Sequence, residues 1–107
     1  MRKAIVKIKG ISAGVLEENQ VGFVFRYEDI YFQNTSQRAV SVTMPKTLQT
    51  YIYPSLFPVF YNMLPEGANK EMICRSLRID ENDFFGLLLA TAQYDTIGAI
   101  TITPIND

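Results

Sequence analysis

The chain has 107 residues, of which 48% are hydrophobic and 20% charged, so it has the length and composition of one globular domain, residues 1–107. It contains no histidine and one cysteine, which excludes most hydrolase triads, structural zinc sites and internal disulfides. Its formal net charge of −1 lacks the excess of Lys and Arg that direct nucleic-acid binding requires. Because the first ten residues offer no apolar run for a signal peptide or membrane span, we expect a cytoplasmic protein that binds no membrane. We also expect that it needs no cofactor.

Alternating apolar residues predict four strands in the first half of the chain. The first two are expected over 4–8 and 13–17. The third covers 23–28, where aromatic residues on one face are typical of a core rather than of a base-stacking platform, because no basic groove accompanies them. The fourth covers 40–44, and residues 45–53 show no period, so we expect an ordered loop there. The aromatic residues of the third strand are Phe23, Phe25 and Tyr27.

The spacing of apolar residues becomes helical after this loop. A first helix is expected over 55–64, with Pro58 tolerated in its first turn and Pro65 ending it. A second helix is expected to begin at about Asn69, a suitable N-cap, and to continue through Leu77. The single cysteine, Cys74, lies inside this helix and is expected to be a buried thiol rather than a reactive one.

The acidic run Asp80-Glu81-Asn82-Asp83 invites comparison with a calcium-binding loop. An EF-hand loop needs a glycine at its sixth position, where this chain has Phe85, so the calcium motif fails. We expect Asp80 instead to cap a third helix that reaches Thr91, followed by a last strand over 98–103. Strands, three short helices and a final strand predict an α+β fold, with a small, largely antiparallel sheet or partial barrel and the three helices inserted before the last strand.

The segment LPEGANK, residues 64–70, could be read as a phosphate-binding loop or as a surface loop that meets another protein. A Walker-type loop needs a second glycine and a hydroxyl residue directly after its lysine, because several backbone N–H groups must converge on the phosphates and the hydroxyl must reach the metal. This segment has only Gly67, and Glu71 follows Lys70. We therefore favour turn chemistry over phosphate binding.

Short blocks of sequence along nearly the whole chain form a set: Ala13-Gly14-Val15-Leu16, Phe25-Arg26-Tyr27, Ser41-Val42-Thr43-Met44-Pro45, Phe57-Pro58-Val59-Phe60, Asn62-Met63-Leu64-Pro65-Glu66-Gly67, Asp83-Phe84-Phe85-Gly86-Leu87-Leu88 and Ile97-Gly98-Ala99-Ile100. As a set they resemble the N-terminal subdomain of HipA-type toxin kinases, and more closely its free-standing form, the HipS-like protein of three-gene toxin–antitoxin systems. The Leu-Pro-Glu-Gly block is the most specific of them, and the order and spacing of the set add to its specificity. One block departs from the family pattern, because Tyr94-Asp95-Thr96 stands where Gly-Asp-Cys or Gly-Asp-Ser is usual.

The resemblance implies a domain without the kinase machinery, since the family's ATP site, catalytic aspartate and metal ligands lie in the segments that follow this one. The run Asp83-Phe84-Phe85-Gly86 only imitates the kinase Asp-Phe-Gly, and its place at a helix start favours capping. The leading hypothesis is a non-catalytic antitoxin or N-terminal lobe of a separately encoded HipA-like serine/threonine kinase. One alternative is an assembly module that bridges the kinase toxin and a DNA-binding HipB-like antitoxin. A small enzyme using Asp or Glu side chains is a further alternative, although no spacing singles out a carboxylate pair.

The candidate partner-binding residues are those between the first two helices. A turn there must be sharp and exposed, so its backbone and side chains are free to meet a partner, with Glu66 available to pair with a basic group. A plain helix–helix connector explains the same residues equally well, and the family resemblance tips the choice towards contact. The candidate residues are Leu64, Pro65, Glu66, Gly67, Ala68 and Asn69.

Overall fold

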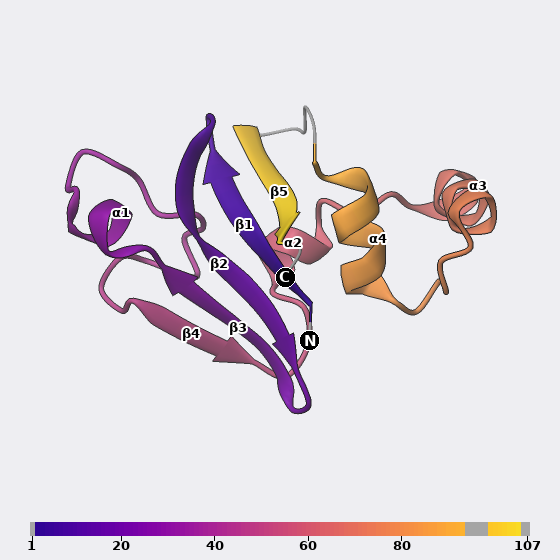
Figure 1. The fold of residues 1–107 in the computed structure, drawn as a ribbon, viewed down its shortest axis with the longest axis horizontal. Helices are drawn as coiled ribbons and strands as arrows, with labels where there is room; N and C mark the ends of the chain where they lie inside the picture. The colour runs from indigo at the N-terminus through magenta and orange to yellow at the C-terminus, as the bar shows by residue number, and fades with distance from the viewer. Residues whose placement is uncertain (1, 94–98, 106–107) are drawn as a thin grey trace.

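The centre of the fold is an open, five-stranded antiparallel sheet with the strand order β4-β3-β2-β1-β5 (Figure 1). The computed structural model describes residues 2–93 and 99–105. Within them, the α+β class and the antiparallel sheet expected from the sequence are confirmed, and the sheet does not close into a barrel. The described strands are β1 Lys3–Ile8, β2 Ile11–Asn19, β3 Gly22–Tyr27, β4 Thr50–Tyr53 and β5 Ile100–Ile105, and the described helices are α1 Asp29–Gln33, α2 Pro58–Tyr61, α3 Gly67–Leu77 and α4 Phe84–Thr91.

Two tight hairpins join the first three strands. Lys9 and Gly10 both have positive φ, of 51° and 80°, which is the backbone of a two-residue turn whose twist suits a hairpin. In the second hairpin, the Asn19 side-chain oxygen accepts hydrogen bonds from the backbone amides of Val21 and Gly22, each at 2.9 Å. These local bonds set the register, so the three alternating strands predicted from the sequence are confirmed.

The inner face of the sheet packs on α2 and α4 and carries the aromatic core. Phe25 and Tyr27 are fully buried, as the alternation along the third strand predicts. Gly14, on the neighbouring strand, must lack a side chain because a Cβ there would lie 2.7 Å from the Phe25 ring and against the Arg26 carbonyl. The inner-face core residues from other elements include Val6, Leu16, Phe60, Phe85, Leu88 and Ile102.

Residues 40–44 do not form the predicted fourth strand. The Tyr27 hydroxyl donates to the Met44 carbonyl at 2.6 Å and accepts from the Val40 amide at 2.9 Å, so it holds both ends of a loop. Val40 and Met44 are buried by this anchoring, whereas Val42 between them is 96% exposed. The alternation of apolar residues over 40–44 therefore reflects a loop held by the Tyr27 hydroxyl, and not a strand held by a ladder of backbone hydrogen bonds.

The expected loop over 45–53 also differs from the structure, because its end forms the edge strand β4. Its backbone pairs with β3 in the register Phe23↔Tyr53 to Arg26↔Thr50. The strand shows no alternation of apolar and polar residues, because large apolar side chains lie on both of its faces. Ile52 on one face is 72% exposed, and Tyr53 on the other stacks on Phe57. The short helix α1 was also not predicted, and it contributes the buried Tyr31, which stacks on Tyr27.

The helices differ from their predicted bounds mainly at their starts. The first predicted helix is reduced to α2, with Pro58 at its first position. The N-cap of α4 is Asp83, whose side chain accepts from the Gly86 amide at 3.0 Å, so the prediction that Asp80 caps this helix is wrong. Asp80 closes a smaller turn through the Asn82 amide. The last strand was expected over 98–103, but β5 continues through Pro104 to Ile105; Gly98 lies outside the described residues.

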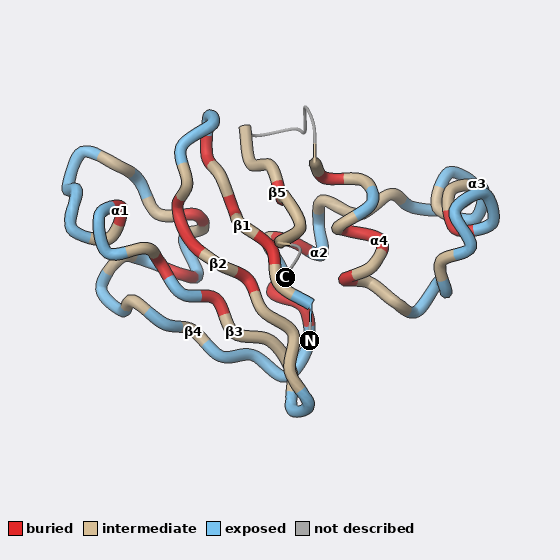
Figure 2. Tube along the Cα trace, in the orientation of Figure 1, coloured by how far each residue is buried: buried red, intermediate tan, exposed pale blue. Residues whose placement is uncertain are grey.

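The helix α3 stands apart from the sheet and from the other helices (Figure 1). Most of it is exposed, with Cys74 as its buried residue (Figure 2), so the expectation of a buried thiol is confirmed. Cys74 nevertheless lies outside the main core cluster. Across the part of the chain that the structure describes, no helix is both long and apolar enough to cross a membrane.

Candidate partner-binding site

The candidate residues lie where the chain turns from α2 into α3. Leu64 and Pro65 are half-buried, and the other four are exposed. The structure corrects the prediction that all six form a loop capped by Asn69, because α3 already begins at Gly67, with Glu66 as an N-cap that makes no side-chain bond. Gly67 has a φ of 59°, a left-handed conformation that glycine adopts readily, so the chain can turn sharply there as it enters the helix.

A hollow of about 200 Å³ opens beside this turn. The Phe84 ring packs edge-on against Tyr61, with ring centroids 5.4 Å apart. The Lys70 ammonium lies 5.3 Å from the centroid of the same ring. The hollow therefore has an aromatic side with a cation over it. Its lining residues are Tyr61, Leu64, Pro65, Glu66, Gly67, Lys70 and Phe84.

This arrangement argues against the phosphate-loop interpretation of the segment. In a phosphate loop the lysine reaches towards the phosphates, but here the Lys70 ammonium is held over an aromatic ring. Glu66 and Lys70 form no ion pair with any described residue, although they are one helical turn apart. A carboxylate and an ammonium thus both lie at the rim of a hollow that has an aromatic side.

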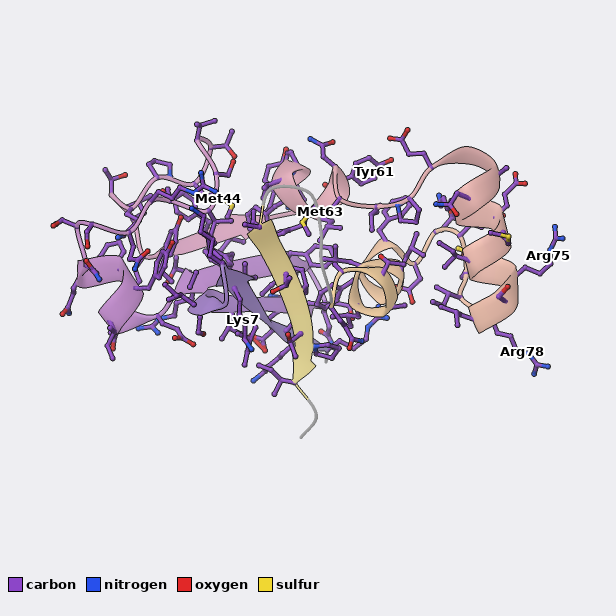
Figure 3. The ribbon with its side chains drawn as sticks, turned by 90° about the horizontal axis from the view of Figure 1, so that it is seen from above. Lys7, Met44, Tyr61, Met63, Arg75 and Arg78 are labelled. Atoms are coloured by element: carbon purple, nitrogen blue, oxygen red, sulfur yellow. The ribbon has the colours of Figure 1, made fainter. Side chains whose placement is uncertain are left out.

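Figure 3 shows how this end of the molecule is arranged. Tyr61 lies beside the chain that leads into α3, and Arg75 and Arg78 extend from α3 away from the rest of the fold. Arg78 ends the helix in a left-handed conformation, with a φ of 56°. The exposed end of the molecule therefore presents basic side chains on one side of α3 and the aromatic hollow beside its N-terminus.

A cluster of charges fixes α4 against the sheet behind this hollow. The Arg2 guanidinium donates to both carboxylate oxygens of Glu18 and of Asp83, at 2.8 to 2.9 Å. It also lies over the Phe85 ring, 5.5 Å from the centroid. The Arg2 hydrogen bonds hold the pKa of the Asp83 carboxyl below its ordinary value, the Gly86 amide acts in the same direction, and burial opposes both. This cluster positions α4, and hence Phe84, rather than offering a reactive group.

Three residues of the hollow were not singled out from the sequence, namely Tyr61, Lys70 and Phe84. Tyr61 and Phe84 lie far apart along the chain and meet only through the packing of α2 on α4, so no local spacing could have paired them. Lys70 was considered only as a phosphate ligand. The departure from the family pattern at 94–96 lies outside the described residues. Within the described residues, no group of three His, Cys, Asp or Glu side chains could hold a metal ion.

The sequence and fold of the chain are similar to those of known proteins. The family model for the HipA N-terminal domain matches residues 4–103. A solved structure described as the N-terminal domain of HipA toxin superposes with a TM-score of 0.75 at 27% identity, covering 100% of this chain and 95% of that one. An uncharacterised protein of Haemophilus influenzae is 31% identical over 102 residues, which are 95% of this chain and 92% of that protein. The fold and the sequence agree with each other, and the chain belongs to the HipA N-terminal domain family.

Proposed function

We propose that the chain is a non-catalytic regulatory partner of a separately encoded HipA-like serine/threonine kinase, acting as its antitoxin or as its missing N-terminal lobe. The observation that carries this proposal is the extent of the Haemophilus influenzae relative. The match covers 92% of that protein, so the domain makes up nearly all of it. A HipA N-terminal domain that occurs without a kinase region needs a kinase from elsewhere to act on.

The turn between α2 and α3 is the surface we assign to this contact. Glu66, Gly67, Ala68 and Asn69 are exposed, and the turn is held at its base by the half-buried Leu64. An exposed turn between two helices has backbone and side chains free to enter the cleft of a folded partner. The hollow beside it supplies a complementary socket for an apolar side chain of the kinase.

The charges around the hollow suggest what the kinase surface carries. Glu66 has no described ion-pair partner and would pair with an Arg or Lys of the kinase. Lys70, over Phe84, would donate to a carboxylate of the kinase at the other rim. Charged rim pairs of this kind contribute mainly to specificity and to the rate of association, while the aromatic hollow contributes most of the affinity.

Co-expression with a HipA-like kinase from the same source, the proposed partner, tests the proposal. We expect a stable complex to elute from size-exclusion chromatography with both proteins present. Elution of the two proteins separately would contradict the proposal. Recovery of the chain with a DNA-binding protein, and not with the kinase, would favour the assembly alternative instead.

The contact surface is tested by the double variant Glu66→Lys with Ala68→Arg. Both side chains are exposed and Glu66 makes no capping bond, so the fold should persist while the altered charge and bulk weaken kinase binding by about tenfold or more. The matched control is Gln20→Lys with Val21→Arg, which adds positive charge at the exposed β2–β3 turn. Titration calorimetry measures both variants, and circular dichroism checks the fold. Equal affinities for the variant and the control would show that residues 64–69 are only a connector.

A further inference from the structure

The edge strand β4 presents unused backbone hydrogen-bonding groups. The Tyr27 amide donates to the Gln49 carbonyl at 2.8 Å, which fixes the alternation of the antiparallel ladder between β3 and β4. Tyr51 and Tyr53 therefore turn their N–H and C=O groups towards β3, whereas Thr50 and Ile52 turn theirs outwards. These outward groups have no partner among the described residues. The edge is a template on which another strand can pair.

The chemistry of this edge is unusual for an unprotected strand. Residues 47–55 contain no charged side chain, and the strand itself contains neither proline nor a bulge. Ile52, at the edge, is 72% exposed. Natural proteins commonly guard such edges with lysine, proline or a bulge. The opposite edge of the sheet does so, because Pro104 lies within β5 and removes one backbone donor.

We infer that β4 pairs with β4 of a second copy of this chain, antiparallel and across a two-fold axis. Around a two-fold axis the side chains of a short edge strand lie opposite or diagonal to their own copies, so a charged edge opposes self-pairing and an uncharged one permits it. The uncharged stretch 47–55 satisfies this condition, and the net charge of −1 adds little repulsion between two copies. A partner of different sequence could match a charged edge with the opposite charge, whereas a second copy could not, so the uncharged edge favours a second copy.

The register follows from the outward-facing groups. Thr50 lies opposite Ile52 of the second copy, and each of these pairs exchanges both of its backbone hydrogen bonds. Tyr51 then faces its own copy across the axis. Within one copy Ile52 pairs with Val24, and the diagonal from Val24 leads to Val15, which pairs with Ile5. Pairing thus joins two apolar strips on the sheet face that α2 and α4 leave open in the described part of the chain (Figure 1).

The association is expected to be weak and dependent on concentration. A four-residue strand buries much less than the roughly 1,600 Å² of a standard stable interface. Sedimentation velocity at concentrations from about 10 μM to about 1 mM covers the range of such affinities. We expect the mass of the parent chain to rise from 12.2 kDa towards twice that value, and the amides of Thr50 and Ile52 to exchange with solvent more slowly as it does so.

Substitutions at the edge decide whether β4 is the interface. Ile52→Lys and, separately, Thr50→Lys place a charge diagonally across from its own copy on the same sheet face, and each should raise the dissociation constant by at least about tenfold. The control Met72→Lys changes an equally apolar, 60% exposed side chain on α3, at the other end of the molecule, and should dimerise like the parent (Figure 1). Kinase binding should be unchanged in Ile52→Lys. This result would show that the dimer surface is distinct from the turn at 64–69 proposed to bind the kinase.

Several results would overturn the inference. One is a parent chain that stays monomeric up to about 1 mM. Another is a dimer that persists in both lysine variants, or one whose formation leaves the exchange of the Thr50 and Ile52 amides unchanged. A monomeric parent together with loss of kinase binding in Ile52→Lys would assign the edge to the kinase instead.

Discussion

Arg2 joins three parts of the chain that are distant in sequence. Its guanidinium binds Glu18 at the end of β2 and Asp83 at the start of α4, and it lies over the Phe85 ring. The side chains are 29–42% exposed, so the ion pairs are screened by solvent and each is worth little alone. Asp83 contributes more to the stability of the fold than the ion pair alone, because its side chain also caps α4. One carboxylate therefore fixes both the start of the helix and its attachment to the sheet.

Replacing Asp83 and Asp80 one at a time should show which of the two aspartates caps α4. Asp83→Ala removes the cap and the Arg2 contact together, and it should lower the free energy of unfolding by about 1–2 kcal/mol. The matched control Asp80→Ala removes only the bond to the Asn82 amide and should lower it by about 0.5 kcal/mol or less. Urea unfolding followed by circular dichroism measures both. Equal losses would contradict the assignment of Asp83 as the cap.

The same carboxylate gives a pH dependence with a defined sign. Because the pKa of Asp83 is lowered in the folded state, its stabilisation is complete above the unfolded pKa of about 4 and is lost as the pH falls through the folded pKa. The difference in unfolding free energy between the parent and Asp83→Asn should therefore shrink below about pH 4. Asp29, whose pKa is also lowered, is present in both proteins and cancels. A difference that stays constant from neutral to acidic pH would show that Asp83 acts only through its shape.

At the scale of elements, α3 is the part least tied to the core. Tyr31 of α1, Phe60 of α2 and Phe85 of α4 all belong to the main cluster, whereas α3 contributes no residue to it. A helix with few buried contacts opens at a lower free energy than the whole domain. The surface proposed for the kinase lies at the start of this helix, so binding and local order should be coupled there.

Labelling of Cys74 measures this local opening directly. The thiol is 4% exposed, so a thiol reagent needs α3 to move, and labelling should be at least about tenfold faster than global unfolding allows. The control is Cys74→Ser with Ala92→Cys, which places the thiol in the main core at a 1% exposed position and should be labelled only at the global rate. Identical rates for the two thiols would mean that α3 unfolds only with the rest of the domain.

Secondary structure was predictable from the sequence where residues close together in the chain determine it, and not where contacts between distant residues do. The first three strands were predicted because alternation and turn residues lie in the same stretch of chain, as at Asn19. Residues 40–44 imitated a strand because the Tyr27 hydroxyl, distant in sequence, buries both ends of their loop. The hollow was not predicted: the turn at 64–69 that borders it has a local signal, but the contact of Tyr61 with Phe84 depends on tertiary packing.

At the scale of the molecule, two surfaces lie at opposite ends of the sheet. The turn at 64–69 and its aromatic hollow adjoin α3, and the uncharged edge strand β4 lies on the far side (Figure 1). This separation allows one copy to bind a kinase and a second copy at the same time. Membership of the HipA N-terminal domain family links the chain to HipA-type toxin systems, and the proposal that it regulates a separate kinase is the central claim.

A titration of the proposed partner, a HipA-like kinase, with the purified chain tests this claim most directly. Autophosphorylation of the kinase is followed while the chain is added from none to a several-fold molar excess, with the Glu66→Lys, Ala68→Arg variant as the matched comparison. The account predicts that kinase activity changes and reaches a plateau at one chain per kinase, and that the variant needs a much higher concentration for the same effect. Kinase activity that stays constant throughout the titration, with no complex formed, would contradict it.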